Sequence, residues 1–164
     1  MTPDLPGGYA LRPATAPDAE AIAVQRGQMF VDMGALTDAQ AWAQRGQWTD
    51  WLRSALPAGV YTGFLVEHGG EVVAGVGVML HPQIPTLTDP ATQRAHVLNM
   101  YVNPDHRRLG LAEALMHAAL AHVRACGLRS VTLNAAPMGR PLYDRLGFTE
   151  SGNPEMRLTL DGPA

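Results

Sequence analysis

The sequence predicts a mixed α/β fold in which one β-sheet carries helices on its faces. Two β-rich runs flank Gly69-Gly70, a pattern typical of a tight hairpin. The second half of the chain alternates strand-like and helix-like apolar patterns. The 164 residues are 46% hydrophobic and 16% charged, which fits a single globular domain over residues 1–164.

The first third of the chain predicts one strand and two helices. Residues 9–14 (YALRPA) fit a short strand. A helix is expected to begin near Pro17 and to stop at Gly34. Residues 37–40 (TDAQ) match a capping box and open a second helix, which Pro57 helps to end.

The arm that follows the glycine pair predicts a central strand. From Val72 to Met79 both alternating faces are apolar or small, so we expect a cover on each side. The Pro- and Thr-rich residues 81–93 fit a long surface loop.

The remaining elements alternate between strand and helix. Strand patterns cover residues 95–102 and 130–135, and a long helix is expected from Leu109 to Cys126. Residues 140–148 fit a short helix with Pro141 near its start. The alternating residues 154–160 (PEMRLTL) predict a closing strand.

Composition excludes several classes of function. A net charge of −3 and a pI of about 6.0 argue against a nucleic-acid partner. The lone cysteine, Cys126, permits no internal disulfide, so a cytoplasmic location is expected. The first residues lack the features of a secretory signal, and no apolar run of about 18 residues predicts a membrane span. We expect no membrane partner and no bound metal.

The segment Asn99–Leu120 carries the strongest functional signal. A short strand, a turn, two arginines and one glycine precede a long helix. Unpaired N–H groups and the helix dipole favour an anion at such a helix N-terminus. Gly110 would let the backbone approach the anion, and Arg107 and Arg108 would add donors. Taken alone, the segment fits better a glycine that only turns the chain, with the arginines in solvent.

Two motifs resemble the GCN5-related N-acetyltransferase (GNAT) family. Residues 107–112 (RRLGLA) resemble its [RQ]-x-x-G-x-[GA] motif, and residues 139–148 (GRPLYDRLGF) resemble its closing tyrosine helix. The order of elements is similar over nearly all of the chain. The resemblance implies a central, mostly antiparallel twisted sheet, splayed at the cofactor site, with helices on both faces.

The resemblance also implies acetyl-CoA, or a close acyl-CoA relative, as the acyl donor. The strand before the motif would carry a bulge, and the pantetheine arm would bond to backbone groups of Met100 and Val102. A backbone N–H near Met100 or Tyr101 would stabilise the oxyanion. Asn134 is similar to a polar residue that meets the cofactor arm in relatives, and it fits equally a turn residue that ends a strand. The pyrophosphate would lie on the backbone amides of Arg107, Arg108, Leu109, Gly110, Leu111 and Ala112.

Catalysis requires a neutral amine and a proton for the departing thiolate. Tyr143 matches the family's general-acid tyrosine; the alternative is a helix tyrosine that packs on the sheet. Asn99 stands where many relatives have a glutamate, and it can orient water or substrate but cannot accept the proton.

Other titratable residues could take part in the chemistry. His96, Glu67 and His68 are further candidates for the base, although each also fits an ordinary strand or turn residue. Cys126 could suggest an acyl-enzyme, but its place at the end of the long helix favours a packed thiol.

The acceptor site is expected on the first helix. Asp32, with Met29 and Met33 beside it, could bind a cationic amine in apolar surroundings. The alternative is that these methionines form the core face of an amphipathic helix.

The expected function is therefore acetyl-CoA-dependent N-acetylation of a primary amine of a small molecule, by direct attack in a ternary complex. The alternatives are acetylation of a protein N-terminus or lysine, and a non-catalytic domain that senses acyl-CoA. A homodimer is common among such relatives and is an expectation here.

Overall fold

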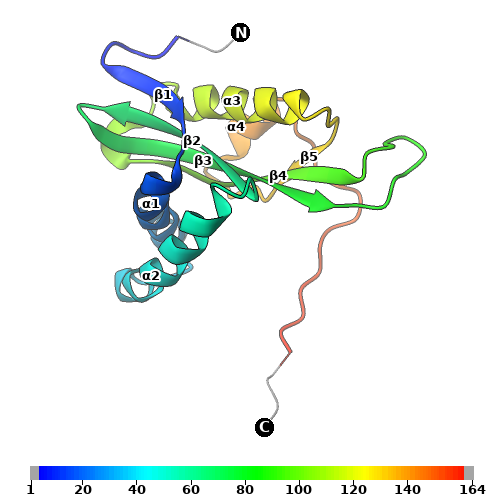
Figure 1. Cartoon of the computed structure of the whole chain (residues 1–164), viewed down its shortest axis with the longest axis horizontal. Coiled ribbons are helices and arrows are strands. Elements are labelled where there is room, and N and C mark those ends of the chain that lie inside the picture. Colours follow the sequence, from blue (N-terminus) through cyan, green and yellow to red (C-terminus); the bar gives the residue numbers. More distant parts are fainter. Residues whose placement is uncertain (1–3, 161–164) are drawn as a thin grey trace. The chain divides into compact units, whose positions relative to one another are not determined.

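The computed structural model describes residues 4–160, and its contacts divide the chain into two compact units (Figure 1). The first unit ends at Asn134, and the second begins at Ala135. The second unit contains helix α4 (Arg140–Arg145). The first contains β1 (Tyr9–Pro13), the 3₁₀ turn η1 (Ala16–Asp18), α1 (Ala19–Asp32), α2 (Asp38–Ala55), β2 (Tyr61–His68), β3 (Glu71–Pro82), β4 (Gln93–Val102), the 3₁₀ turn η2 (Pro104–His106), α3 (Leu111–Ala125) and β5 (Val131–Leu133).

The five strands form one sheet in the order β1-β2-β3-β4-β5. The first three pairings are antiparallel, and β4 pairs with β5 in parallel. This confirms the prediction of a mixed, mostly antiparallel sheet. Gly69 and Gly70 form the turn of the β2–β3 hairpin with φ values of 60° and 84°, a conformation that favours glycine at both positions. Strand β3 lies between β2 and β4, as its two apolar faces predicted.

Helices cover both faces of the sheet. Figure 1 shows α1 and α2 on one face and α3 on the other. Ile22 of α1 and Leu52 of α2 share a buried cluster with Tyr61 and Leu65 of β2. On α3 the buried side chains recur at helical spacing, which gives this helix its core face: Leu111, Ala114, Leu115, Met116, Ala119 and Val123.

Helix α2 begins at the predicted capping box. The Thr37 hydroxyl accepts a hydrogen bond from Gln40 N at 3.2 Å, and the Gln40 side-chain oxygen accepts one from Thr37 N at 2.9 Å. These two bonds satisfy donors that would otherwise be unpaired at the helix start. Helix α2 carries Trp48 and Trp51.

An ion-pair network fixes the junction between β1 and α1. Arg12 of β1 lies 2.8 Å from Asp18 in η1 and 2.6 Å from Glu67 of β2. Asp18 also accepts a bond from Thr15 N at 2.7 Å. The hydrogen bond from Arg12 lowers the pKa of Asp18 from 3.8 to about 2. Asp18 therefore stabilises the folded chain in its charged form.

We expect the Asp18→Asn variant to lose about 2 kcal/mol of unfolding free energy at neutral pH. Because the folded pKa lies below the unfolded one, the advantage of the wild type is complete above pH 4 and disappears as the pH falls toward 2. Urea unfolding of both proteins across this range measures the difference. Asp50→Asn is the control, since its pair with Arg53 is 80% exposed on the aspartate side. A constant difference between wild type and Asp18→Asn down to pH 2 would contradict this assignment.

Two strands have different limits from those predicted. The hairpin arms of β3 and β4 extend as far as the pair Pro82–Gln93, so the connecting loop is shorter than the predicted 81–93. Polar residues can form strand pairs at this end of the β3–β4 hairpin, because the end is largely exposed to solvent. Strand β5 is shorter than the predicted 130–135 and contains three residues.

The predicted closing strand at residues 154–160 is wrong. Within the described part of the chain, no strand forms there, and Met156, Leu158 and Leu160 are 93%, 81% and 81% exposed. Alternation predicts which side chains would share a strand face, but it does not supply a neighbouring strand with which to pair.

Candidate functional site

Strand β4 contains a bulge at Asn99. Gly75 pairs with Tyr101 and Gly77 with Leu98, so Val76 alone faces both Asn99 and Met100. Asn99 adopts φ = 55°, a left-handed conformation that asparagine tolerates better than most residues. The bulge lies in the strand where the resemblance to N-acetyltransferases implied one.

Just before the bulge, β4 separates from β5. The two strands pair only from Ala95–Val131 to Val97–Leu133, whereas β4 continues to Val102. The backbone on this side of β4, past Val97, has no paired strand among the described residues. Asn134 follows β5 where the strands part, and it is exposed. An extended ligand could therefore bond to the free backbone of β4 as an added strand would.

The loop after β4 leads into the N-terminus of α3. Arg108 and Gly110 have φ values of 63° and 77°. A Cβ at Gly110 would meet no atom within 4 Å, so steric crowding does not require glycine there. The left-handed backbone conformation of the residue is what favours glycine. The first helical bond runs from Ala114 N to Gly110 O at 3.0 Å, which leaves the N–H groups of Leu111 and Ala112 ahead of it. Gly110 thus faces open space beside unpaired donors, a geometry suited to an anion.

The two arginines of the loop have different roles. Arg107 donates through Nε to Val102 O at 3.0 Å and through Nη2 to Asp32 Oδ2 at 2.7 Å. Its side chain therefore ties the loop to β4 and to the end of α1. Arg108 is exposed. Burial, with the charge of Asp32, raises the pKa of Tyr101 beside this pair.

A second set of contacts fixes η2. The Tyr9 hydroxyl lies 2.8 Å from Nδ1 of His106, and the Tyr9 ring stacks on His68 with a centroid distance of 4.3 Å. These contacts attach the turn before the anion loop to the β1–β2 edge. The anion loop is thus attached to β4 and α1 through Arg107, and the turn before it is attached to the β1–β2 edge through Tyr9 and His106.

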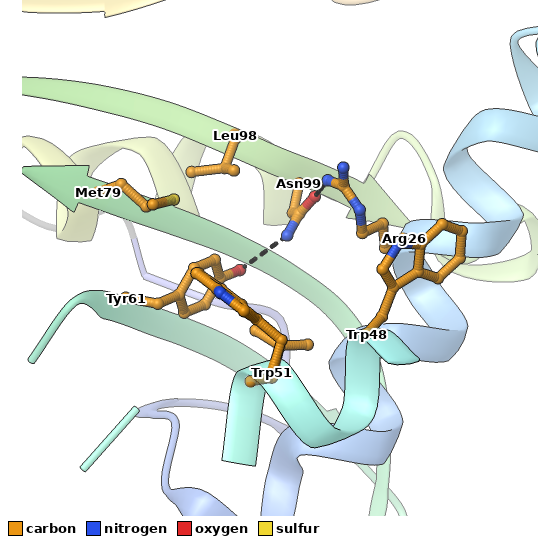
Figure 2. Close-up of a pocket in the computed structure, with 8 residues that line it drawn as sticks. Arg26, Trp48, Trp51, Tyr61, Met79, Leu98 and Asn99 are labelled. Carbon is orange, nitrogen blue, oxygen red and sulfur yellow. Dashed lines mark hydrogen bonds between the residues drawn. The ribbon is translucent and has the colours of Figure 1, made fainter. Parts of the chain in front are cut away.

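A pocket of about 250 Å³ opens beside the bulge (Figure 2). Helices α1 and α2 supply one wall, and strands β2, β3 and β4 supply the other. The lining is largely apolar and aromatic: Arg26, Trp48, Trp51, Leu52, Tyr61, Met79, Leu98 and Asn99.

Three polar groups form a chain along the pocket. Arg26 Nη1 donates to Asn99 Oδ1 at 2.5 Å, and Asn99 Nδ2 donates to the Tyr61 hydroxyl at 3.1 Å (Figure 2). Burial raises the pKa of Tyr61 to about 12, so its hydroxyl stays protonated at neutral pH. Asn99 thus uses both ends of its amide inside the protein, which fixes the side chain at the bulge.

Arg26 is a half-buried cation among aromatic rings. Its guanidinium carbon lies 4.8 Å from the Phe30 ring centroid and 5.4 Å from that of Trp48. Burial lowers the pKa of Arg26. Within residues 4–160 no carboxylate forms an ion pair with it. Cation–π contacts and one amide oxygen are its partners.

The pocket contains one of the residues predicted for chemistry, Asn99. Met29, Asp32 and Met33, predicted for the acceptor, are not among the side chains that line it. The carboxylate of Asp32 is bonded to Arg107 instead.

Sequence reasoning missed Arg26 and Tyr61. The available signals were weak: an arginine within the apolar run of α1, and two glycines in the central strand. Gly77 is one of these, and a Cβ there would overlap the Tyr61 phenol.

The other candidate bases lie elsewhere in the sheet. His96 Nδ1 lies 2.8 Å from the Thr132 hydroxyl, Glu67 pairs with Arg12, and His68 stacks on Tyr9. None of the three lines the pocket.

The prediction of a packed thiol at Cys126 is wrong. The residue caps α3 at its C-terminus and is exposed, because the core face of the helix ends at Val123.

The second unit contains Tyr143. This residue is 8% exposed in α4, its ring lies 5.9 Å from that of Phe148, and burial raises its pKa. A Cβ at Gly139 would approach the Tyr143 ring to 2.8 Å, so the glycine makes room for it. The hydroxyl is therefore protonated at neutral pH, as a proton donor must be.

Among the residues described, no group of three or more His, Cys, Asp or Glu side chains could hold a metal ion. No helix between residues 4 and 160 combines the length and the apolar character needed to cross a membrane.

The chain is similar to curated acetyltransferases. It is 35% identical to a mycothiol acetyltransferase of Geodermatophilus obscurus over 69% of this chain and 42% of that protein. It is 32% identical to a mycothiol acetyltransferase of Thermobispora bispora over 90% of this chain and 48% of that protein. The chain thus spans less than half the length of these two relatives.

Solved structures share the fold. A GCN5-related N-acetyltransferase from Ralstonia eutropha has a TM-score of 0.83 and 33% identity, over 92% of this chain and 99% of that one. A predicted acetyltransferase from Clostridium acetobutylicum, solved with acetyl-CoA, has a TM-score of 0.83 at 19% identity, over 92% of this chain and 96% of that one. The sequence profile of the acetyltransferase (GNAT) family matches residues 28–148. A match over this much of the chain, together with the bulged β4 and the loop at α3, shows that the protein is a member of the acetyltransferase (GNAT) family.

Proposed function

We propose that this protein is an acetyl-CoA-dependent N-acetyltransferase that acetylates a primary amine of a small molecule. The observation that carries the proposal is the bulge at Asn99 beside the gap between β4 and β5, directly before the loop at the N-terminus of α3. An extended donor with a phosphate end needs this combination of free strand backbone and anion site.

The residues of the first unit fit the donor. Backbone groups of Met100, Tyr101 and Val102 would meet the extended arm, and the open space at Gly110 would admit the pyrophosphate beside the N–H groups of residues 108–112. Arg108 is exposed and available to the phosphates, whereas Arg107 already bonds Asp32 and Val102. Asn134 directly follows Leu133, the last residue of β5 that pairs with β4.

The reaction is direct transfer in a ternary complex. The amine nitrogen attacks the thioester carbonyl, the C–N bond forms, and the C–S bond breaks. The thiolate takes a proton, for which the resemblance to the family's general-acid tyrosine nominates Tyr143, and the nitrogen loses its proton to water. Among the described residues no carboxylate lines the pocket, and Asn99 holds its side chain toward Arg26 and Tyr61, which supports water as the acceptor of that proton.

A small acceptor suits the dimensions of the site. The pocket of about 250 Å³ is smaller than the clefts of roughly 300–1,000 Å³ that hold drug-sized ligands. The names of the curated relatives, which include a mycothiol acetyltransferase and a glucosamine 6-phosphate N-acetyltransferase, also support a small acceptor.

Binding of acetyl-CoA and release of its thiol test the proposal. Purified protein should bind acetyl-CoA in calorimetry and release free CoA thiol with at least one member of a broad panel of amines. Failure to bind acetyl-CoA would contradict the donor site. Binding without thiol release would leave a domain that senses acyl-CoA.

The Asp32–Arg107 pair yields a separate prediction. We expect Asp32→Asn to weaken acetyl-CoA binding several-fold and to leave the KM of the acceptor unchanged, because Asp32 fixes Arg107 and hence the loop. Calorimetry with acetyl-CoA and steady-state kinetics with a saturating donor separate the two quantities. A rise in acceptor KM with unchanged donor affinity would instead give Asp32 the acceptor role that its sequence context suggested.

A further inference from the structure

We propose that the acceptor is a primary amine that also carries a carboxylate and an apolar or aromatic group, and that Arg26 binds the carboxylate in the pocket beside Asn99. An apolar or aromatic amino acid is the simplest molecule of this class. The inference rests on the proposed function and specifies the substrate of the same site.

The charge of the pocket is the first argument. Of the described residues that line it, Arg26 is the one with a charged side chain. The guanidinium has five N–H donors, and the hydrogen bond to Asn99 uses one of them. A half-buried cation without a carboxylate partner is a costly arrangement, which an anionic ligand relieves.

The apolar walls are the second argument. Trp51 of α2 and Met79 and Leu98 of the sheet line the pocket, and Trp48 of α2 lies beside Arg26 (Figure 2). Such a surface binds an aliphatic or aromatic side chain through burial and ring contacts. The Trp51 ring is already edge-on to Tyr61 at 6.3 Å, so the aromatic wall is preformed.

The position of the acids is the third argument. A purely cationic amine would need a carboxylate near its ammonium group, and within residues 4–160 no acid lines the pocket. Asp32, the nearest candidate from the sequence, is bonded to Arg107 at 2.7 Å. The positive charge of Arg26 also disfavours the protonated form of a nearby amine, which promotes the neutral nucleophile that the reaction requires.

The direct test compares matched acceptors. L-Phenylalanine and L-methionine are assayed against phenethylamine and 3-(methylthio)propylamine, their analogues without the carboxylate, by release of CoA thiol. We expect kcat/KM to favour the amino acids by about tenfold or more, mainly through KM, because the carboxylate contact is present in the ground state as well. Equal or better turnover of the analogues would overturn the inference while leaving the N-acetyltransferase proposal intact.

Variants of Arg26 test the residue itself. Arg26→Gln should abolish the preference for the carboxylate, and Arg26→Lys should retain part of it. The matched control is Arg45→Gln, since Arg45 also lies on a tryptophan, 3.8 Å from the Trp42 ring, but does not line the pocket. Unchanged acetyl-CoA affinity and melting temperature in Arg26→Gln exclude a folding defect. An undiminished preference in a folded Arg26→Gln protein would overturn the role of Arg26.

Binding decides the question even without turnover. Trp48 and Trp51 line the pocket, so their fluorescence reports an acceptor that enters it. L-Phenylalanine should shift the emission at concentrations about tenfold lower than phenethylamine, and Arg26→Gln should remove the difference. Absence of thiol release with every amine would refute the proposed function, whereas equal binding of the two probes would refute the carboxylate site alone.

Discussion

Replacing Tyr143 with phenylalanine should lower kcat about a hundredfold or more and leave the affinity for acetyl-CoA unchanged. In the proposed reaction the phenol supplies the proton that the departing thiolate needs, and a phenyl ring cannot supply it. Burial raises the pKa of Tyr143, so the proton is present throughout the neutral range. Phenylalanine keeps the ring that packs against Phe148, so the second unit should fold normally.

Steady-state thiol release gives kcat for this variant, and calorimetry gives the dissociation constant of acetyl-CoA. Tyr9→Phe is the matched control, because it also deletes one hydroxyl. That hydroxyl bonds His106 in the turn before the anion loop, so any loss should appear in donor affinity and not in kcat. An unchanged kcat in Tyr143→Phe would assign protonation of the thiolate to water.

The sequence predicted the fold where local rules determine the structure. Gly69 and Gly70 specified the hairpin turn, and Thr37 specified the start of α2, because each depends on residues within a few positions. The double-sided apolar pattern of residues 72–79 specified a central strand. The failed strand at residues 154–160 had the right period but required a partner, and pairing is a property of the whole sheet.

The candidate site was predicted only in part, for the same reason. The anion loop is continuous in sequence, so the glycine, the arginines and the helix start could be recognised together. The pocket is assembled from distant segments: Arg26 and Asn99 are 73 residues apart, and Asn99 and Tyr61 are 38 apart. No periodicity links such residues. The Asp32–Arg107 pair, separated by 75 residues, likewise became visible only in the folded chain.

Replacing Gly77 with alanine should destabilise the protein by about 3 kcal/mol and close the pocket. Tyr61 is 2% exposed and lies directly over Gly77, where an added Cβ would overlap its phenol. The ring must shift, and the hydrogen bond from Asn99 to its hydroxyl would be lost. Urea unfolding measures the free energy, and tryptophan fluorescence during acceptor titration reports the pocket.

Two comparisons isolate the steric cause. Gly46 lies within α2, and a Cβ there meets no atom within 4 Å, so Gly46→Ala should stabilise the protein by about 0.5–1 kcal/mol. The double variant Gly77→Ala/Tyr61→Leu should lose less stability than the two single losses combined, because leucine frees the space that the new methyl group needs. Strict additivity would show that Gly77 matters for a reason other than its contact with Tyr61. In that case the Gly77→Ala substitution would act on the backbone of β3 independently of the pocket, and the Tyr61 ring would not connect the two.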